Sequence, residues 1–225
     1  MQSTVLLLFI RYPEPGRVKT RLAARIGADE AAELYRNFIL DILATLEGCG
    51  LPLKMCFSPV EKKAALLAWL GPDYAFRPQR GTDLGMRMRR AFEEAFGEGF
   101  ASGILLGSDV PDLPLYVLKE AIDALQRSDA VIGPAQDGGY YLIGFRRDAF
   151  PPDVFGGLPW GTAGVLRDTT ARLVAHGCRI HLLPEWQDVD TAEDLEALSK
   201  RAQNTDFSRS KTAAFLSGSD LTGRP

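Results

Sequence analysis

Short apolar runs alternate along the chain with longer segments in which apolar residues recur at three- and four-residue spacing. The short runs predict buried strands, and the longer segments predict amphipathic helices. The predicted strands are residues 4–10, 51–57, 75–77, 103–107, 130–133, 140–145 and 179–183, and the predicted helices are residues 34–46, 61–70, 83–96, 115–126, 162–175 and 191–200. Because strands and helices alternate, we expect parallel βαβ units with helices on both faces of one sheet.

Two segments depart from this regular alternation. The connection between residues 133 and 140 is too short for a crossover helix, so one antiparallel strand is expected. The prediction is an α/β fold with one Rossmann-like, open, mixed and mostly parallel sheet, in a single domain over residues 1–201. Residues 202–225 are polar and lose the helical period, and they form a C-terminal extension. Such a composition is typical of disorder, unless the domain surface or a neighbouring subunit holds the extension.

Composition and charge exclude several classes of protein. A net charge of −3, from 26 basic and 29 acidic residues, excludes the strongly basic domain of a general nucleic-acid binder. The apolar run at the N-terminus has no basic residues before it and is too short for a membrane span. Three cysteines without a C-x-x-C pair do not suit a disulfide framework. We therefore expect a cytoplasmic protein without nucleic-acid or membrane partners.

The small net charge conceals two basic segments. Residues 11–25 and residues 77–90 each hold five basic residues against one acidic residue. Both begin where predicted strands end, and ligands of open α/β sheets bind at the carboxyl ends of strands. In the first segment, Lys19 offers a point charge and Arg21 a bidentate fork to a phosphate group. A solvated basic face is the alternative interpretation.

The second basic segment contains a candidate for base recognition. Gln79 carries a donor and an acceptor that can read the edge of a base, and Gly81 lets a ring approach the backbone. The same segment is equally well explained as a helix N-terminus with Asp83 as its cap.

Acidic residues follow two other predicted strands. Asp109 comes directly after the strand at residues 103–107, which favours a metal ligand, because Mg²⁺ prefers carboxylates together with substrate phosphates. Asp112 is interpreted as the cap of the following helix. Near the last strand, Asp188 and Asp190 lie on one face, and Asp190 is the candidate for a second carboxylate. Helix capping is its competing role, although Thr191 opens a capping box there.

The acceptor side is predicted between these motifs. Gly138 and Gly139 allow close approach to the backbone, and Asp137 beside them can meet a hydroxyl or amine of an acceptor. A hairpin turn explains the paired glycines almost as well. Trp160 can stack on a substrate ring, with a core tryptophan as the alternative. The two histidines do not suit a histidine metal site, and the chain has no G-x-G-x-x-G motif.

Together these motifs resemble the nucleotide-diphospho-sugar transferase superfamily, which has the GT-A fold. They resemble more closely a bacterial glycosyltransferase-like branch with a Pro-x-Pro-Gly-x-x-Lys-Thr-Arg-Leu loop, here residues 13–22. The sequences Gly-Ser-Asp-Val-Pro at 107–111, Asp-Gly-Gly-Tyr-Tyr-Leu at 137–142 and Asp-Val-Asp-Thr at 188–191 extend the resemblance to roughly residues 4–200. Phospholactate guanylyltransferases are similar at the Lys-Thr-Arg-Leu part of the loop.

The resemblance implies roles for particular residues. Asp109 would bind Mg²⁺ or Mn²⁺, with Asp190 as its second carboxylate. The implied nucleotide-binding residues are Arg11, Gly16, Lys19, Arg21, Gln79 and Gly81. The sequence departs from the superfamily at two places, because it lacks both a Gly-Gly loop after the first strand and an Asp-x-Asp motif after the strand at 103–107.

The leading hypothesis is a metal-dependent transferase that uses a nucleoside-diphosphate sugar. Lys19 and Arg21 would supply fixed positive charge for catalysis, and Asp137 would act as the acceptor-side base. The alternative is a nucleotidyltransferase that joins a nucleoside triphosphate to a phosphate or carboxylate acceptor and releases pyrophosphate. A second alternative is a non-catalytic nucleotide-binding protein. The sequence leaves a homo-oligomer open.

Overall fold

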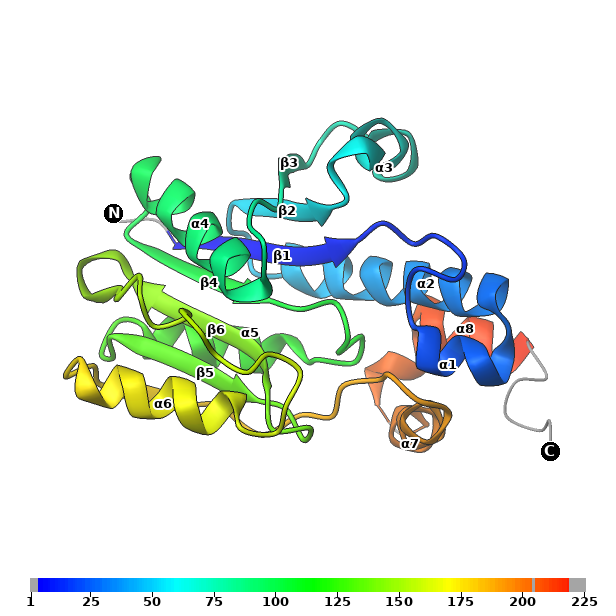
Figure 1. The fold of residues 1–225 in the computed structure, drawn as a ribbon. Coiled ribbons are helices and arrows are strands. Elements are labelled where there is room, and N and C mark those ends of the chain that lie inside the picture. The colour runs from blue at the N-terminus through cyan, green and yellow to red at the C-terminus, as the bar shows by residue number, and fades with distance from the viewer. Residues whose placement is uncertain (1–3, 204, 219–225) are drawn as a thin grey trace.

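A computed structural model of the protein describes residues 4–203 and 205–218. Its centre is a seven-stranded sheet with the order β3-β2-β1-β4-β6-β5-β7 (Figure 1). The strands are β1 Thr4–Arg11, β2 Leu53–Ser58, β3 Ala75–Pro78, β4 Ser102–Leu106, β5 Ala130–Pro134, β6 Tyr140–Arg146 and β7 Ile180–Leu182. All seven predicted strands are confirmed, with ends displaced by at most two residues.

The sheet is mixed because one strand runs against its neighbours. Strand β6 is antiparallel to both β4 and β5, whereas the other paired strands are parallel. The tight connection between β5 and β6 makes this direction unavoidable, since a few residues suffice for a hairpin but not for a crossover. The predicted open, mostly parallel sheet is confirmed.

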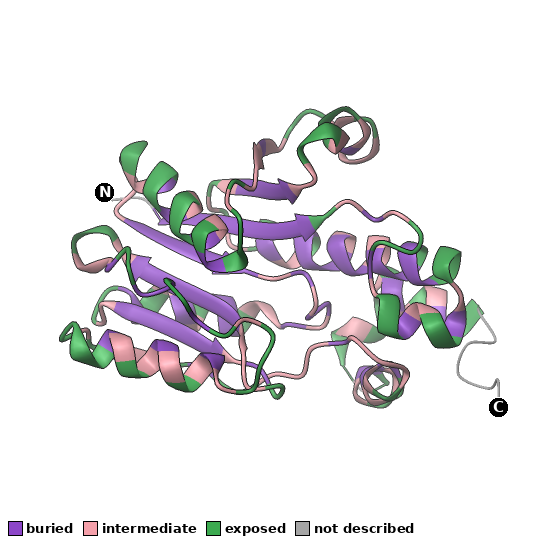
Figure 2. Ribbon diagram, in the orientation of Figure 1, coloured by how far each residue is buried: buried purple, intermediate pink, exposed green. Residues whose placement is uncertain are grey.

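Helices cover both faces of the sheet. The predicted helices correspond to α2 Ala28–Glu47, α3 Lys63–Leu70, α4 Leu84–Gly97, α5 Leu115–Ala124, α6 Val165–Ala175 and α7 Ala192–Ala202. Strand β1 alternates between two cores: Leu6, Leu8 and Ile10 pack with α2 and α5, and Val5, Leu7 and Phe9 pack with α4 and α6. Figure 2 shows the buried strands enclosed by helices with exposed outer faces. Within the described ranges, no helix is long and apolar enough to cross a membrane.

The first basic segment contains a helix that the sequence pattern did not predict. Helix α1 covers Thr20–Ile26 and buries Leu22 and Ile26. Two buried positions in seven residues are too few to establish a helical period. Lys19 is the N-cap residue of this helix.

The C-terminal extension is ordered where the structure describes it. It contains the short 3₁₀ helix η3, Asp206–Arg209, and helix α8, Lys211–Gly218, which lies beside α2 (Figure 1). The buried carboxylate of Asp41 in α2 accepts hydrogen bonds from the backbone N–H groups of Lys211 at 2.9 Å and Thr212 at 2.8 Å. The domain itself therefore holds this part of the extension, and residues 219–225 lie outside the described residues.

Two of three predicted helix caps are confirmed. Asp83 accepts a hydrogen bond from the backbone of Met86 at 2.8 Å, and Thr191 forms a capping box at the start of α7. The prediction for Asp112 is wrong, because α5 begins after Pro114 without a side-chain cap. The buried Asp112 carboxylate instead binds Nε of Arg201 at 2.6 Å. Leaving a buried charge without a charged partner costs more free energy than leaving a helix end without a cap.

Candidate active-site cleft

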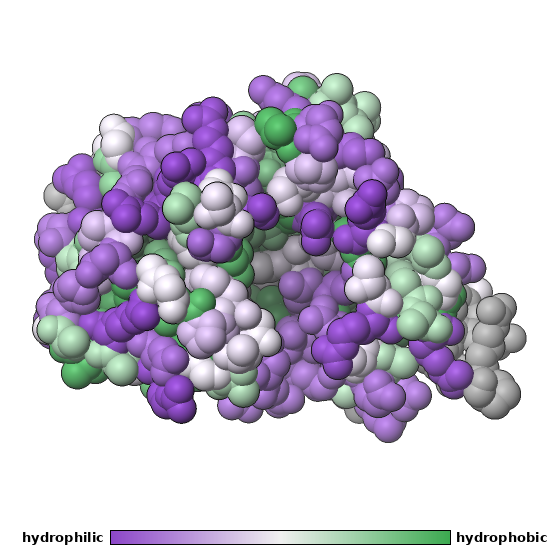
Figure 3. All heavy atoms as spheres, viewed as in Figure 1, coloured by the Kyte–Doolittle hydropathy of each residue, from purple (hydrophilic) through white to green (hydrophobic). Residues whose placement is uncertain are grey.

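A cleft of about 450 Å³ opens at the carboxyl ends of β1 and β4. Figure 3 shows it as a hollow near the middle of the molecule, with apolar residues along part of its wall. Residues from both basic segments, both acidic segments and the predicted acceptor side line it, among them Arg11, Gln79, Asp109, Asp137, Gly139, Trp160 and Asp190, whereas no residue of the loop at 13–22 does. The fold thus brings together residues that lie far apart in the sequence.

Lys19 lies directly against two acidic residues of the cleft. Its Nζ is 2.5 Å from Oδ1 of Asp109 and 2.7 Å from Oδ1 of Asp190, and it also donates to the backbone oxygen of Val189 at 2.7 Å. The Lys19 side chain is only 4% exposed. Burial opposes its charge, but the two carboxylates outweigh burial and raise the pKa of Lys19 above its ordinary value. The ammonium group is therefore permanently charged in the folded protein at physiological pH.

The backbone of Lys19 is in an unusual conformation. Its φ is +46°, which makes it the one non-glycine residue with positive φ in the described chain. A residue with a side chain adopts this left-handed conformation at a cost in free energy, and such strain is concentrated at functional sites. The strain is offset here by the contacts that the ammonium group makes with Asp109 and Asp190.

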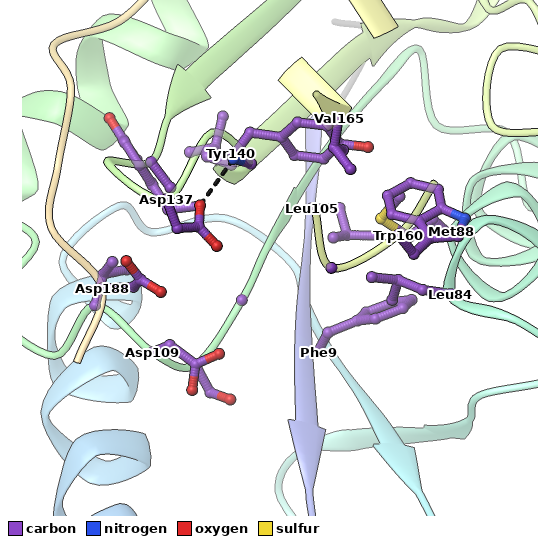
Figure 4. A pocket seen from close by; sticks show the side chains of 18 of the residues that line it. Phe9, Leu84, Met88, Leu105, Asp109, Asp137, Tyr140, Trp160, Val165 and Asp188 are labelled. Atoms are coloured by element: carbon purple, nitrogen blue, oxygen red, sulfur yellow. Dashed lines mark hydrogen bonds between the residues drawn. The ribbon is translucent and has the colours of Figure 1, made fainter. Parts of the chain in front are cut away.

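The side of the cleft that Lys19 contacts carries a surplus of negative charge. Burial raises the pKa of Asp188 to about 6, and the charges of three neighbouring carboxylates add to this rise. Those neighbours are Asp137, Asp190 and Asp109. Figure 4 shows Asp109, Asp137 and Asp188 on one side of the cleft. Lys19 supplies only one positive charge to this group, so a cationic ligand would be favoured here.

The carboxylates suit a hard divalent cation that also binds a ligand. In the described part of the chain, no three Asp, Glu, His or Cys side chains lie close enough together to hold a metal ion by themselves. Mg²⁺ commonly takes one or two carboxylates and completes its oxygen ligands with water and substrate phosphates. Asp109 and Asp190 lie close enough together for one ammonium group to contact both of them.

Other predicted nucleotide-binding residues lie in different surroundings. Arg11 lines the cleft with an exposed side chain, at the end of β1. Gln79 also lines it, but its amide nitrogen donates to the backbone oxygens of Ile10 at 3.2 Å and Cys56 at 2.8 Å. The amide therefore ties together β1 and β2, and its carbonyl oxygen is the group that it offers to a ligand. Arg21 is exposed on α1 and does not line the cleft.

Three predicted glycines also lie outside the lining of the cleft. Gly16 has a φ of +73° in the exposed loop before α1. A side chain at Gly81 would place its Cβ 2.8 Å from the backbone nitrogen of Arg87, so this glycine permits close packing on α4. Gly138 has a φ of +87° and approaches the backbone of Ala163 in the same way. The structure thus explains Gly81 and Gly138 by packing of the chain on itself.

The other residues of the predicted acceptor side border the cleft. Oδ1 of Asp137 accepts a hydrogen bond from the backbone N–H of Gly139 at 2.7 Å, shown in Figure 4. Trp160 is half-buried, and its ring meets the ring of Tyr140 edge-on at 6.4 Å between centroids. The ring packs on the core and also borders the cleft, so stacking of Trp160 on a substrate ring stays a prediction.

Sequence reasoning did not single out several residues of the cleft. Arg87 lines it, and its Nε donates to the backbone oxygen of Gly81 at 3.2 Å. The hint in the sequence was the basic segment at residues 77–90. Its five basic residues look alike in the sequence, and only the orientation of α4 shows that Arg87 faces the cleft. Leu84 and Met88 belong to the predicted amphipathic helix at residues 83–96, and the structure shows that both also border the cleft.

Comparisons with known proteins identify the family of the chain and the structures that it resembles. Residues 42–162 match the model of a family described as "Uncharacterized protein conserved in bacteria (DUF2064)". The chain belongs to this family. No curated protein matches the DUF2064 chain. A crystal structure from Desulfovibrio desulfuricans G20, described as a "putative nucleotide-diphospho-sugar transferase", has 45% sequence identity and a TM-score of 0.95, covering 99% of this chain and 97% of that one.

More distant structures share the fold alone. One is CMP:2-keto-3-deoxy-manno-octonic acid synthetase complexed with CTP, with 14% identity and a TM-score of 0.54, covering 90% of this chain and 100% of that one. Another is the manganese complex of Rv0371C from Mycobacterium tuberculosis H37Rv, with 18% identity and a TM-score of 0.50, covering 88% and 97%. The predicted superfamily, and with it a transferase, is confirmed.

Proposed function

We propose that this DUF2064 protein binds a nucleoside-diphosphate sugar and a divalent cation in the cleft and transfers the sugar to an acceptor. The contact of Lys19 with both Asp109 and Asp190 is the observation that carries the proposal. The contact joins the basic loop after β1 to Asp109, which follows β4, and to Asp190, which precedes α7. It lies at the carboxyl ends of the strands, where α/β sheets bind ligands. Opposite charges at one point in a cleft suit a phosphate chain with a cation.

The chain supplies fixed positive charge to the diphosphate. Arg11 and Arg87 line the cleft and would bind phosphate oxygens directly. Lys19 contacts two lining residues, Asp109 and Asp190, and would exchange part of this contact for phosphate oxygens. Arg21, in the first turn of α1, would add to the positive field of the loop after β1.

Asp109 and Asp190 would hold the divalent cation. When bound, such a cation offsets the negative charge that develops on the leaving diphosphate. The manganese complex of Rv0371C, which shares the fold, supports a cation in this superfamily. The four carboxylates near the cleft also support it, because Lys19 balances only one of their charges.

Asp137 is the proposed base for the acceptor. The hydrogen bond from the Gly139 N–H fixes its carboxylate at the cleft. Asp137 would take the proton of the acceptor hydroxyl, whose oxygen forms a bond to the sugar carbon. The bond from that carbon to the diphosphate breaks, and the nucleoside diphosphate leaves with the electron pair. Proton transfer of this kind is typically worth about 10²–10⁴-fold in rate.

A nucleotidyltransferase is the second candidate. The CTP-bound synthetase that shares the fold favours it, as does the similarity of residues 19–22 to phospholactate guanylyltransferases. The protein would then join a nucleoside triphosphate to a phosphate or carboxylate acceptor and release pyrophosphate. A non-catalytic role is disfavoured. It would explain Asp109 and Asp190 as helix caps, but α5 has no side-chain cap and Thr191 caps α7.

A thermal-shift panel tests the proposal. Nucleoside-diphosphate sugars and nucleoside triphosphates are measured with Mg²⁺, with Mn²⁺ and with a chelator. A ligand at about 100 times its Kd adds about 2.7 kcal/mol, which for a chain of this size raises Tm by about 5–10 °C. Absence of a metal-dependent shift with every nucleotide would refute both candidates.

Two further measurements complete the test. Asp109→Asn should abolish the metal-dependent part of the shift, whereas Asp123→Asn, an exposed carboxylate on α5, should leave it unchanged. For a nucleotide that binds, release of nucleoside diphosphate indicates sugar transfer, and release of pyrophosphate indicates nucleotidyl transfer.

A further inference from the structure

The cleft has a second half with a different chemical character. Figure 4 shows Asp109, Asp137 and Asp188 on one side and a group of apolar side chains on the other. These apolar residues come from β1, β4, α4, α6 and the loop before α6, and they are Phe9, Leu84, Met88, Leu105, Trp160 and Val165. We refer to these six residues as the apolar half of the cleft.

In the apolar half, Phe9, Met88, Leu105 and Val165 are buried, and Leu84 and Trp160 are the two side chains that stay accessible to solvent. Leu84, at the start of α4, is 43% exposed and borders the cleft. Trp160 is fixed behind it, because its ring packs near Tyr140 and Phe155. Helix α4 approaches this ring so closely that a Cβ at Gly85 would lie 2.8 Å from Cζ2 of Trp160.

The side chains of the apolar half offer almost no hydrogen bonds. The indole N–H of Trp160 is the one hydrogen-bond donor among the six side chains. A sugar, a sugar phosphate or a nucleobase would find a single donor among these six side chains in place of its hydrogen bonds to water, and this costs free energy. An alkyl or aryl group loses none and gains free energy from burial.

We propose that the apolar half binds the alkyl or aryl body of the acceptor. The acceptor is then an amphiphilic alcohol or acid, with its polar nucleophile toward Asp137 and its apolar body against Trp160 and Leu84. The direction of transfer rests on the proposed function, but the binding of the apolar body does not. The base of the nucleotide lies toward Gln79, whose carbonyl oxygen remains for it.

Ligand-observed NMR on the full chain tests this assignment. The probes are benzyl alcohol, which carries an aryl body and a hydroxyl group, and glucose as the polar comparison. Benzyl alcohol should bind and glucose should not. Leu84→Asn should weaken benzyl alcohol binding roughly fivefold to tenfold, the effect of losing one partly buried apolar contact. Val174→Asn, at an exposed apolar position on α6 outside the cleft, is the matched control and should change nothing.

Three results would overturn the assignment. Glucose binding as well as benzyl alcohol would show that the cleft does not select an apolar body. Unchanged benzyl alcohol binding in Leu84→Asn would place the probe elsewhere. Displacement of benzyl alcohol by a saturating nucleoside diphosphate would show that the base occupies the apolar half.

The same measurements separate this assignment from the proposed function. If no nucleotide gives a thermal shift but benzyl alcohol binds in a Leu84-dependent manner, the proposed function fails and the apolar site stands. If nucleotides bind with a cation and benzyl alcohol does not bind, the apolar site fails and the proposed function stands. Both variants change residues near or at the surface, and unchanged circular dichroism confirms that they fold.

Discussion

Replacing Lys19 with methionine removes the ammonium group between Asp109 and Asp190 while keeping a buried apolar stem. The two N–O distances are 2.5 Å and 2.7 Å, so both ion pairs are in direct contact. Removing one partner of a buried ion pair typically costs about 3–5 kcal/mol. Asp109 and Asp190 are 47% and 43% exposed, so water takes over part of the lost interaction. We therefore expect the free energy of unfolding to fall by about 2–3 kcal/mol and Tm to fall by about 5–10 °C.

The same geometry predicts that a divalent cation compensates for this loss. In the Lys19→Met variant, the oxygens of Asp109 and Asp190 are free to bind Mn²⁺ without competition from the ammonium group. Mn²⁺ at about ten times its Kd adds about 1.4 kcal/mol. Scanning calorimetry over a series of Mn²⁺ concentrations at neutral pH should therefore show a larger rise in Tm for the variant than for the unmodified protein.

A second buried lysine provides the control. Nζ of Lys54 lies 2.5 Å from Oε2 of Glu98, and both residues are outside the cleft. Lys54→Met should also lower Tm, but Mn²⁺ should not restore it. Equal responses of the unmodified protein and Lys19→Met to Mn²⁺ would refute the reasoning that the ammonium group and the cation compete for the same oxygens.

Three further predictions follow from individual contacts. The pKa of Asp188 rises from 3.8 to about 6 on folding, so the folded protein binds more protons than the unfolded chain between these pH values, and the ionised carboxylate lowers stability above pH 6. Urea denaturation should therefore show Asp188→Asn to be about 1–2 kcal/mol more stable at pH 7.5, after allowance for the partial exposure of the side chain, with the gain lost near pH 4. Asp41→Ala removes both acceptors at the start of α8, which should lower the free energy of unfolding by about 1–2 kcal/mol and speed hydrogen exchange in residues 211–218. Gly138→Ala places a Cβ 2.5 Å from Cα of Ala163 at a φ of +87°, and calorimetry should show a loss of at least about 2 kcal/mol.

Each of these predictions has a result that contradicts it. A gain in stability for Asp188→Asn that does not depend on pH would mean that its charge is not the cause. Unchanged hydrogen exchange in α8 after Asp41→Ala would mean that apolar packing on α2 alone holds the helix. Gly50→Ala is the control for Gly138→Ala, because Gly50 also has a positive φ but has no neighbour within 4 Å. Equal losses at the two glycines would show that backbone strain, rather than the approach of Ala163, determines the effect.

The sequence by itself determined the secondary structure and the places where the chemistry occurs. Apolar spacing depends on neighbours a few residues away, so it predicted all seven strands and six helices. Predicted strands also located the carboxyl ends at which Asp109, Lys19 and Gln79 occur. Helix α1 and the extension escaped prediction for the same reason, because each short segment holds too few apolar positions to establish a period.

The tertiary structure alone decided which of these residues meet. Lys19 and Asp190 are 171 positions apart, and their contact depends on the order of strands in the sheet. The local sequence pattern could not reveal that the ammonium group of Lys19 contacts both expected metal ligands. Nor could it reveal that Asp41 binds the start of α8, 170 positions away. Nor could it show that one face of α4 belongs both to the core and to the cleft. Such contacts form only in the packed tertiary structure. A charged group that is buried there is stable only if an oppositely charged group lies beside it, and that partner often comes from a distant part of the chain.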